Sequence, residues 1–586
     1  MDRLDHYDSV WVVDFEYTAD PGQVPDPVCM VAIDLKGNRE LRLWRGEMDV
    51  PCPFDTSDRS LFVVYSEAGD MGCFLQLGWP LPDRVVDLYP EIKQIFYDRP
   101  ESTSSSLLNA CASYGIQTIE SADKDYFRDL IIYRRYTDND REAMIDYCRS
   151  DVVATGELFR RMLKDLARDA LTWNGVLLRG RYTNALSKME RQGIPIDTES
   201  LGLAMTHWDD IKLGLVQEIG QAYGVYDGSS FKTALFEDYL RRNAIPWPRL
   251  DSGALALDDD TFRMQARSHP QIAGLRELRH LLSGMRLSEY TIGHDGRNRV
   301  FLNPYGSVSG RNQPSNSRFI FGSARWARSF IKPPEGFGLA YVDWSSQEFM
   351  IGAALSGDPN MLADYQGGDV YLAFAVRAGL APSGATKHTH KAARQRAKAI
   401  VLGTSYGMGA ESIARDAGLL VDEARELLLR HRTTYSRYWR FVEDTQTTGA
   451  LGFPLRTTFG WTRQVKPGKV GINLRSLGNW PMQANGAEMM RLACSRVTEA
   501  GIGLCCPVHD ALLIEAPLDV LDETCNTVQS IMQEASEVVL GAGNVVRTGA
   551  DIVRFPDVYV DENAGDVYSR VMRLANVAAD RTRNVL

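Results

Sequence analysis

Hydrophobic and polar residues alternate in short runs over the first part of this 586-residue chain. Five apolar, strand-like runs are separated by segments with helical spacing; the runs are VWVVDFEY, CMVAIDL, RLWRG, LFVVYSE and RVVDLY. Strands that alternate with helices predict an α/β domain over residues 1–171. In the first run, Asp14 and Glu16 lie two positions apart, so both side chains should point to one face of the strand.

The spacing then becomes mostly helical. In the segment YTNALSKMERQGIPID, Leu186 and Met189 share one helix face, and Gly193 and Pro195 predict the end of that helix. Helical spacing continues over residues 201–295, where single glycines and prolines interrupt it. No tandem repeat or long low-complexity tract is evident.

The remaining chain mixes short strands with helices. A segment rich in Gly, Ser, Asn and Pro precedes the strand-like run LAYVDW, which brings Asp343 to its end. A long helical region follows, and CCPVHDALLIEAP then predicts two strands with Asp510 at the turn between them. Two carboxylates at strand ends suggest a two-metal site for phosphoryl transfer.

Between these two acids, the run RQRAKAIVLGTSYG carries polar and aromatic residues in steps of four. Such a step keeps side chains on one slowly drifting face of a helix. This face, which suits a nucleoside triphosphate, consists of Arg394, Lys398, Leu402 and Tyr406.

The charge distribution favours a nucleic-acid partner although the net charge is −11. Three stretches contain Arg and Lys but no Asp or Glu, namely residues 296–334, 370–410 and 445–487. If folding brings them together, an acidic protein presents a basic cleft to phosphate groups. The alternative is three solvated surfaces that lack acids by chance.

Composition excludes several other classes of protein. The nine cysteines are scattered without a CxxC pair, and no HExxH occurs, so neither a disulfide framework nor a zinc site is signalled and a reducing cytosol fits. No apolar run reaches the roughly 18 residues that a membrane helix needs. A replicative helicase is disfavoured because the GxxxxGK[ST] phosphate loop is missing.

The segments around Asp343, Arg394 and Asp510 resemble motifs A, B and C of the family A DNA polymerases. The resemblance implies a multidomain α/β and α+β protein, in which a ribonuclease H-like 3′–5′ exonuclease domain precedes a right-hand polymerase with palm, fingers and thumb. The implied domains are the exonuclease (1–171), the entry to the palm (172–200), the thumb (201–295), the palm with motif A (296–358), the fingers with motif B (359–459), and the palm with motif C and the C-terminal tail (460–586).

In this family pattern, Asp343 and Asp510 would bind two Mg²⁺ ions, with Mn²⁺ as a substitute. Arg394 and Lys398 would hold the β- and γ-phosphates of the incoming nucleotide. Tyr406 would lie near the templating base. Leu402 stands where the family commonly has an aromatic residue that affects tolerance of altered sugars, so dideoxynucleotide sensitivity is not predicted.

Glu348 matches the glutamate beneath the nucleotide sugar that would clash with a ribose 2′-hydroxyl. The resemblance also assigns contacts with primer and template; the residues are Arg311, Arg475, Asn479, Gln483 and His509. Contacts in the minor groove suit shape checking without sequence reading. Four residues depart from the family pattern and put the number of metal ligands and the primer grip in doubt; they are Ser346, Met350, Tyr371 and Ala511.

In the first domain, Asp14 and Glu16 resemble exonuclease motif I. Tyr147 and Asp151 stand four apart on an expected helix and resemble motif III, with Tyr147 orienting the attacking water. Asp70 would supply the acid of motif II, where Ser66 occupies the usual Asn position. These acids would bind the metal pair of an active proofreading exonuclease.

The resulting prediction is a DNA-dependent DNA polymerase with proofreading activity, acting as a monomer on primer–template DNA with deoxynucleoside triphosphates. No separate 5′-nuclease domain is evident, which favours a phage replicase in the host cytoplasm. A processivity factor, helicase or primase partner is not predicted. Two alternatives remain: a single-subunit RNA polymerase, which Glu348 and the exonuclease motifs oppose, and a non-catalytic DNA-binding scaffold, which the retained Asp343 and Asp510 oppose.

Overall fold

The computed structural model describes residues 3–65, 68–96, 104–118, 121–283, 287–466, 471–561 and 564–585. Ser66 lies outside these residues. Contacts divide the chain into two units. Unit 1 comprises Met1–Gly193, Phe301–Pro314 and Leu339–Ile552; unit 2 comprises Ile194–Val300, Ser315–Gly338 and Val553–Leu586.

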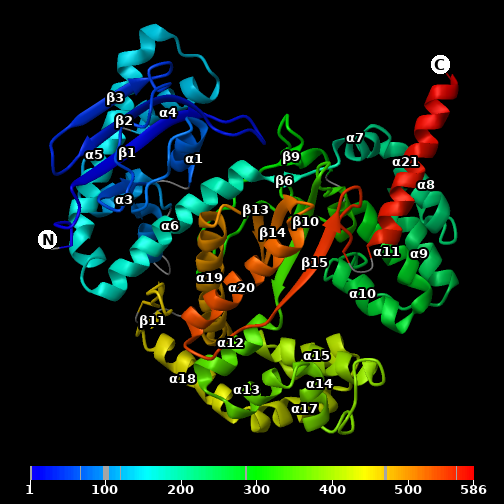
Figure 1. The fold of residues 1–586 in the computed structure, drawn as a ribbon. Coiled ribbons are helices and arrows are strands. Elements are labelled where there is room, and N and C mark those ends of the chain that lie inside the picture. The colour runs from blue at the N-terminus through cyan, green and yellow to red at the C-terminus, as the bar shows by residue number, and fades with distance from the viewer. Residues whose placement is uncertain are drawn as a thin grey trace. The chain divides into compact units, whose positions relative to one another are not determined.

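Unit 1 begins with a five-stranded sheet of order β3-β2-β1-β4-β5 (Figure 1). The strands are β1 (Ser9–Thr18), β2 (Asp26–Asp34), β3 (Glu40–Trp44), β4 (Ser60–Val64) and β5 (Val85–Asp87). β1 pairs antiparallel with β2 and parallel with β4. The accompanying helices are α1 (Gly69–Gln76), α2 (Leu88–Phe96), α3 (Leu107–Ser113), α4 (Ser121–Ile132) and α5 (Arg141–Leu166).

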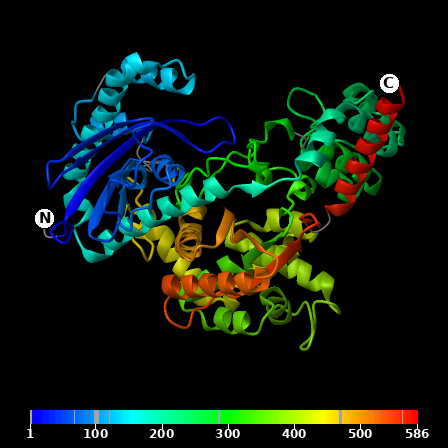
Figure 2. The same cartoon turned by 45° about the horizontal axis from the view of Figure 1, so that its top comes forward.

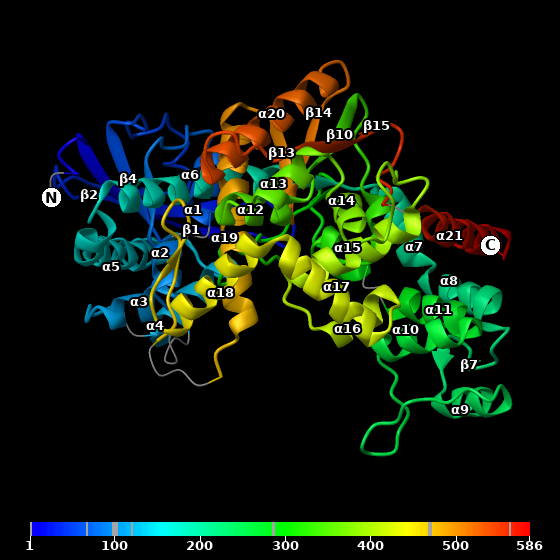
Figure 3. The same cartoon turned by 90° about the horizontal axis from the view of Figure 1, so that it is seen from below.

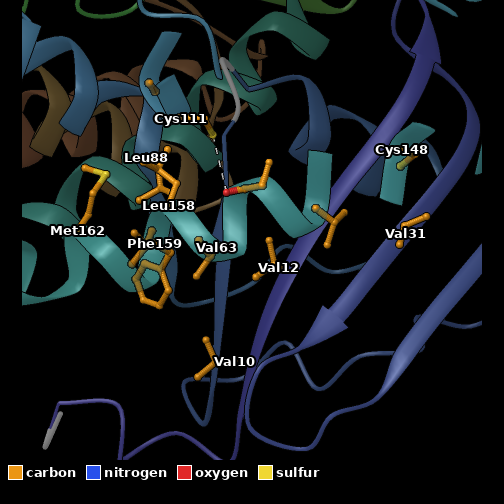
Figure 4. Packing of buried hydrophobic residues seen from close by; sticks show 14 of the residues in the cluster. Val10, Val12, Val31, Val63, Leu88, Cys111, Cys148, Leu158, Phe159 and Met162 are labelled. Atoms are coloured by element: carbon orange, nitrogen blue, oxygen red, sulfur yellow. Dashed lines mark hydrogen bonds between the residues drawn. The ribbon is translucent and has the colours of Figure 1, made fainter. Parts of the chain in front are cut away.

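The alternation along β1 divides its side chains between two cores. Trp11, Val13 and Phe15 belong to one cluster of buried residues, together with Phe74 of α1. Val10 and Val12 belong to the other, which α5 covers (Figure 4). Because strand side chains alternate with a period of two, Asp14 and Glu16 continue the Val10–Val12 face toward α5.

The helix α6 (Ala170–Gln192) packs within unit 1 against α1, β5, α19 and β13. Asp169 caps its first turn and Gly193, with φ of 62°, ends it, as the sequence predicts. Two glycines allow close backbone approach, since a Cβ at Gly175 would overlap the carbonyl oxygen of Phe459 and one at Gly180 that of Val85.

A second sheet has the order β13-β14-β10-β15 and crosses the middle of Figure 1. Its strands are β10 (Phe337–Trp344), β13 (Gly503–Val508), β14 (Ala511–Pro517) and β15 (Thr548–Arg554). β10 and β15 run antiparallel, because the Ser345 amide donates to the Arg547 carbonyl at 2.8 Å and the Phe555 amide to the Phe337 carbonyl at 3.2 Å. This register puts Gly549 opposite Asp343.

Helices of unit 1 accompany this sheet. The helices α12 (Gln347–Ser356), α19 (Leu474–Glu499) and α20 (Leu521–Leu540) pack against one another. The helices between α12 and α19 in the chain, all labelled in Figure 3, are α13 (Pro359–Gln366), α14 (Val370–Arg377), α15 (Lys391–Ser405), α16 (Ala410–Ala417), α17 (Val421–Thr434) and α18 (Ser436–Ala450), of which α13 packs on α12 and α18 on α19. A hairpin of β11 (Leu455–Arg456) and β12 (Thr462–Arg463) precedes α19.

Unit 2 is mostly helical. Its helices are α7 (Thr198–Thr206), α8 (Trp208–Leu215), α9 (Thr233–Arg242), α10 (Asp259–Ser268), α11 (Ala273–Ser283) and α21 (Gly565–Val585). Its short strand pairs are β6 (Ile194–Pro195) with β9 (Arg297–Asn298) and β7 (Tyr226–Asp227) with β8 (Ser230–Phe231). Helix α21, the red helix at the C-terminus in Figure 2, packs against α7 and α8. Among the described helices, none is long and apolar enough to cross a membrane.

Candidate functional site

Asp343 and Asp510 lie at the ends of neighbouring strands of the second sheet. Asp343 is the penultimate residue of β10, and Asp510 lies in the two-residue turn that joins β13 to β14. His509 has a positive φ of 54°, which is the left-handed conformation that such a tight turn requires. The Trp344 amide donates to the Asp510 carbonyl at 3.0 Å and ties the turn to β10.

Both aspartates line a cavity of about 470 Å³. The other residues around it come from the segment before β10, from α12, α14 and α15, and from the β13–β14 turn; they are Arg311, Trp344, Ser346, Gln347, Glu348, Phe349, Tyr371, Val401, Leu402, Ser405, Tyr406 and His509. The cavity therefore brings together Asp343, Asp510 and five more of the predicted site residues, Arg311, Glu348, Leu402, Tyr406 and His509.

The electrostatics of the two carboxylates suit a cation. Burial raises the pKa of Asp343, and the nearby Asp551 raises it further. Burial also raises the pKa of Asp510, with a further contribution from Asp343. Because like charges at a partly buried site disfavour ionisation, a divalent cation bound between the carboxylates would relieve the cost. The oxygen donors present thus fit Mg²⁺.

Two residues on β15 adjoin Asp343 although the sequence did not single them out. A Cβ at Gly549 would lie 2.9 Å from Asp343 Oδ1, so only glycine leaves room for the carboxylate. Asp551 lies two positions further along the same strand and therefore on the same face. The run TGADIV shows a glycine and an acid in a strand, but only the register of β15 on β10 connects them with Asp343.

Glu348 of α12 is held by an ion pair inside the cavity. Arg311 Nη2 donates to Glu348 Oε1 at 3.0 Å, and only 15% of the Glu348 side chain is exposed. Burial raises the pKa of Tyr406, and the adjacent Glu348, which is within hydrogen-bond reach, raises it further. Arg311, Glu348 and Tyr406 thus form one connected polar group.

Arg394 and Lys398 of α15 lie outside the cavity lining but near its Tyr371 wall. The Arg394 guanidinium lies 5.3 Å and the Lys398 ammonium 5.8 Å from the centre of the Tyr371 ring. Arg394 is also paired with Asp369, which caps the N-terminus of α14 through the Tyr371 and Leu372 amides. Asp369 was not among the predicted site residues, because its contact with Arg394 depends on α14 packing beside α15.

The three predicted DNA contacts on α19 lie one turn apart, as the step of four requires, and none lines the cavity. Arg475 is exposed and packs close to Gly407, directly after Tyr406. Asn479 Oδ1 is buried without a hydrogen-bond partner among the described residues. Gln483 follows at an intermediate level of burial. The side of α19 that begins near Tyr406 therefore offers polar groups to a ligand.

The predicted exonuclease residues gather where β1 meets α1 and α5. The Phe15 amide, between Asp14 and Glu16, donates to Asp70 Oδ1 at 3.1 Å, which fixes the buried Asp70 beside the motif I pair. Burial raises the pKa of Glu16 well above its usual value, and Asp14, Cys29, Asp151 and Asp70 add to this effect. Four carboxylates therefore share one site.

Helix α5 presents Tyr147, Cys148 and Asp151 to these acids. Burial is the main cause of the raised pKa of Tyr147, and the nearby carboxylates of Glu16 and Asp151 raise it further. Its ring stacks on Phe127 at 4.9 Å between centroids. Ligand atoms of Asp14, Glu16 and Cys148 lie within 4.8 Å of one another, which fits a bound cation. Of Asp14, Glu16, Tyr147, Cys148 and Asp151, only Cys148 was not among the predicted site residues.

Comparison with known proteins shows similarity in both fold and sequence. The fold is that of the POL domain of Pol1 from M. smegmatis, solved in complex with DNA primer–template and dNTP, with a TM-score of 0.70 over 94% of this chain and 96% of that chain, at 18% identity. Residues 317–550, which carry both Asp343 and Asp510, match the family described as DNA polymerase family A. The matched residues include all three segments that resemble polymerase motifs, those around Asp343, Arg394 and Asp510.

Relatives by sequence are bacterial DNA polymerases I. The chain is 25% identical over 421 residues to the Chloroflexus aurantiacus protein, covering 67% of this chain and 44% of that protein. It is 25% identical over 449 residues to the Deinococcus radiodurans protein, covering 72% of this chain and 46% of that protein. The chain thus spans a little under half the length of these relatives.

Proposed function

We propose that the protein is a DNA-dependent DNA polymerase that adds deoxynucleotides to a primer 3′-end. The observation that carries the proposal is the cavity in which Asp343 and Asp510 lie together with Arg311, Glu348 and Tyr406. These side chains lie within or beside the part of the chain that matches DNA polymerase family A. The similarity to bacterial DNA polymerases I further supports primer–template DNA and dNTPs as substrates.

In this proposal, Asp343 and Asp510 hold two Mg²⁺ ions, for which Mn²⁺ can substitute. When bound, such ions stabilise the attacking and leaving oxygens of an in-line phosphoryl transfer. Arg394 and Lys398 bind the triphosphate through charge-assisted hydrogen bonds, for which Arg394 exchanges its Asp369 partner for phosphate oxygens. The chain's own contribution is thus to position the reactants and to neutralise charge.

Nucleotide choice is assigned to the polar group of Glu348, Arg311 and Tyr406. The ion pair with Arg311 keeps Glu348 in one place, where its carboxylate excludes a ribose 2′-hydroxyl. We assign contacts with the primer–template to Arg311, His509 and the α19 residues, which are Arg475, Asn479 and Gln483. Leu402, in the cavity wall, completes the nucleotide pocket.

We further propose a 3′–5′ proofreading exonuclease in a ribonuclease H-like N-terminal domain. The gathering of Asp14, Glu16, Asp70 and Asp151 beside Tyr147 supports it. Two cations would be held by the acids, and Tyr147 would orient the attacking water. A phage source, a cytoplasmic location and monomeric action stay predictions, and the relatives that the chain matches are bacterial.

The test is a gel assay with a 5′-labelled primer on a longer template in Mg²⁺, with and without the four dNTPs. We expect extension with dNTPs and stepwise shortening without them. Asp343→Asn should abolish extension and keep shortening, whereas the double change of Asp14 and Glu16 to Ala should do the reverse. An unchanged extension rate in Asp343→Asn would refute the assigned polymerase site.

Ribonucleotides distinguish the DNA polymerase from a single-subunit RNA polymerase. The wild type should extend with dNTPs in preference to rNTPs, because the Glu348 carboxylate would otherwise meet the 2′-hydroxyl. Glu348→Ala should raise incorporation of rNTPs relative to dNTPs. Equal use of both nucleotide types by the wild type would contradict the role of Glu348.

A further inference from the structure

Cys148 belongs to the buried core that α5 covers, and it also lies beside the carboxylates of the proposed exonuclease site. Helix α5 carries it toward the strand pair β1–β2, next to Val31 (Figure 4), and its side chain is fully buried. Its Sγ atom lies 3.3 Å from the Asp14 carbonyl oxygen and 3.5 Å from Asp14 Oδ2. The thiol therefore touches the same residue that begins the proposed metal site.

The donors around Cys148 have the number and spacing of a metal site. One ligand atom each from Asp14, Glu16 and Cys148 lies within 4.8 Å of the others, and no other such group of three occurs in the described part of the chain. A second thiol adjoins them, because Cys29 lies opposite Glu16 on β2 and within hydrogen-bond reach of Cys148. Strand β1 and helix α5 thus supply two carboxylates and one thiol to one point, with the Cys29 thiol of β2 beside Cys148.

This mixed donor set differs from what Mg²⁺ prefers. Mg²⁺ takes oxygen ligands and keeps several waters, whereas Zn²⁺ binds thiolate sulfur at about 2.3 Å and carboxylate oxygen at about 2.0–2.2 Å. Tetrahedral ligands at those distances lie roughly 3.5 Å apart. The observed separation of 3.5 Å between Cys148 Sγ and Asp14 Oδ2 already meets this spacing.

We propose that Asp14, Glu16 and Cys148 form a site for a thiophilic divalent cation such as Zn²⁺, which competes there with Mg²⁺ and switches off primer shortening. Binding replaces the Cys148 S–H bond with a metal–sulfur bond, and the proton leaves to water. No redox step is involved. The inhibitory effect rests on the proposed exonuclease function, but the binding itself does not.

Selectivity between the two candidate active sites follows from their donors. The cavity around Asp343 and Asp510 contains no cysteine among its lining residues. Low concentrations of Zn²⁺ should therefore act on shortening before they act on extension, because sulfur ligands favour the softer cation. The ratio of shortening to extension in one reaction would then report occupancy of the thiol-containing site.

Cobalt provides a direct readout of sulfur ligation that does not depend on activity. The full-length, reduced protein is titrated with Co²⁺ without added Mg²⁺, and absorption is followed in the near ultraviolet. We expect a thiolate-to-cobalt charge-transfer band, which Zn²⁺ abolishes by displacement. Cys148→Ala should lose the band and bind Co²⁺ at least about tenfold more weakly. Cys111→Ala, which changes a buried cysteine of α3 in the same domain, should keep the band.

The second measurement is Zn²⁺ inhibition of shortening in the presence of Mg²⁺, with primer extension as the folding control for each variant. Zn²⁺ should slow shortening by the wild type and by Cys111→Ala at concentrations that spare Cys148→Ala. An absent cobalt band, or one that persists in Cys148→Ala, would overturn the site. Equal inhibition of all three proteins would overturn its effect on the reaction. Absence of shortening by the wild type would instead contradict the exonuclease function, and the cobalt band would still decide the site.

Discussion

Gly549→Ala probes whether the position of the Asp343 carboxylate governs DNA synthesis. The register of β15 on β10 sets Gly549 opposite Asp343, and the added Cβ would lie 2.9 Å from Asp343 Oδ1. Carbon atoms make favourable contacts at about 3.5 Å or more, so the carboxylate would have to move by roughly half an ångström. The substitution thus displaces the carboxylate without removing it.

The expected loss follows from the size of this displacement. A misplacement of about 1 Å at a reacting centre can cost about 10²-fold in rate, so half that shift predicts a loss of roughly tenfold, or about 1.4 kcal/mol. Folding should not suffer, because alanine in a strand is favoured over glycine by about 0.5–1 kcal/mol in conformational terms. The prediction is a slower chemical step at unchanged thermal stability.

Single-turnover extension of a primer by one nucleotide, at saturating dNTP, measures the chemical step, and a melting curve measures stability. Gly202→Ala is the matched control, because a Cβ at that glycine meets nothing within 4 Å. A rate for Gly549→Ala within twofold of the wild type would refute the reasoning. A slow rate together with a lower melting temperature would point to damage to the fold instead.

Three further predictions concern stability. Burial and Asp551 raise the pKa of Asp343 in the folded protein, so the ionised carboxylate destabilises the fold at neutral pH. Asp343→Asn should therefore raise the melting temperature at pH 7–8 when no divalent cation is present. This gain should vanish below about pH 4, where the carboxyl group is protonated in both the folded and the unfolded protein. Burial lowers the pKa of His431 to about 3, so below about pH 6.5 the unfolded protein binds a proton that the folded protein does not. The free energy of unfolding should therefore fall by up to about 1.4 kcal/mol per pH unit below that pH. Urea unfolding at pH 7 and pH 5 should show a smaller decrease for His431→Leu than for the wild type. Gly180→Ala should lower the free energy of unfolding by about 3 kcal/mol, because its Cβ would overlap the Val85 carbonyl, whereas Gly202→Ala should not.

The sequence predicted those parts of the candidate sites that depend on local spacing. The steps of four on α15 and α19, the pair Asp14 and Glu16 on one strand face, and the acids at strand ends all follow from the periods of helices and strands. The helix end at Gly193 follows from the conformational freedom of glycine. Each of these features needs only neighbouring residues.

Features that depend on long-range pairing could not be predicted. Gly549 and Asp551 matter only because β15 pairs with β10 in one register, which the local pattern does not encode. Asp369 meets Arg394 through the packing of α14 on α15. Cys148 stands between two predicted residues of motif III, yet its closeness to Asp14 depends on how α5 crosses β1.

The buried contacts of α6 with the first 171 residues limit how the protein can be truncated. Arg179 forms a buried ion pair with Glu91 of α2, with both side chains 3% exposed, and it also donates to the Phe459 carbonyl. A chain cut at residue 171 would keep Arg179 and lose Glu91, and removal of one partner from a buried pair costs about 3–5 kcal/mol. A variant intended to keep the proposed polymerase activity and to lose the proposed exonuclease activity should therefore be made by replacing carboxylates, with residues 1–171 left attached.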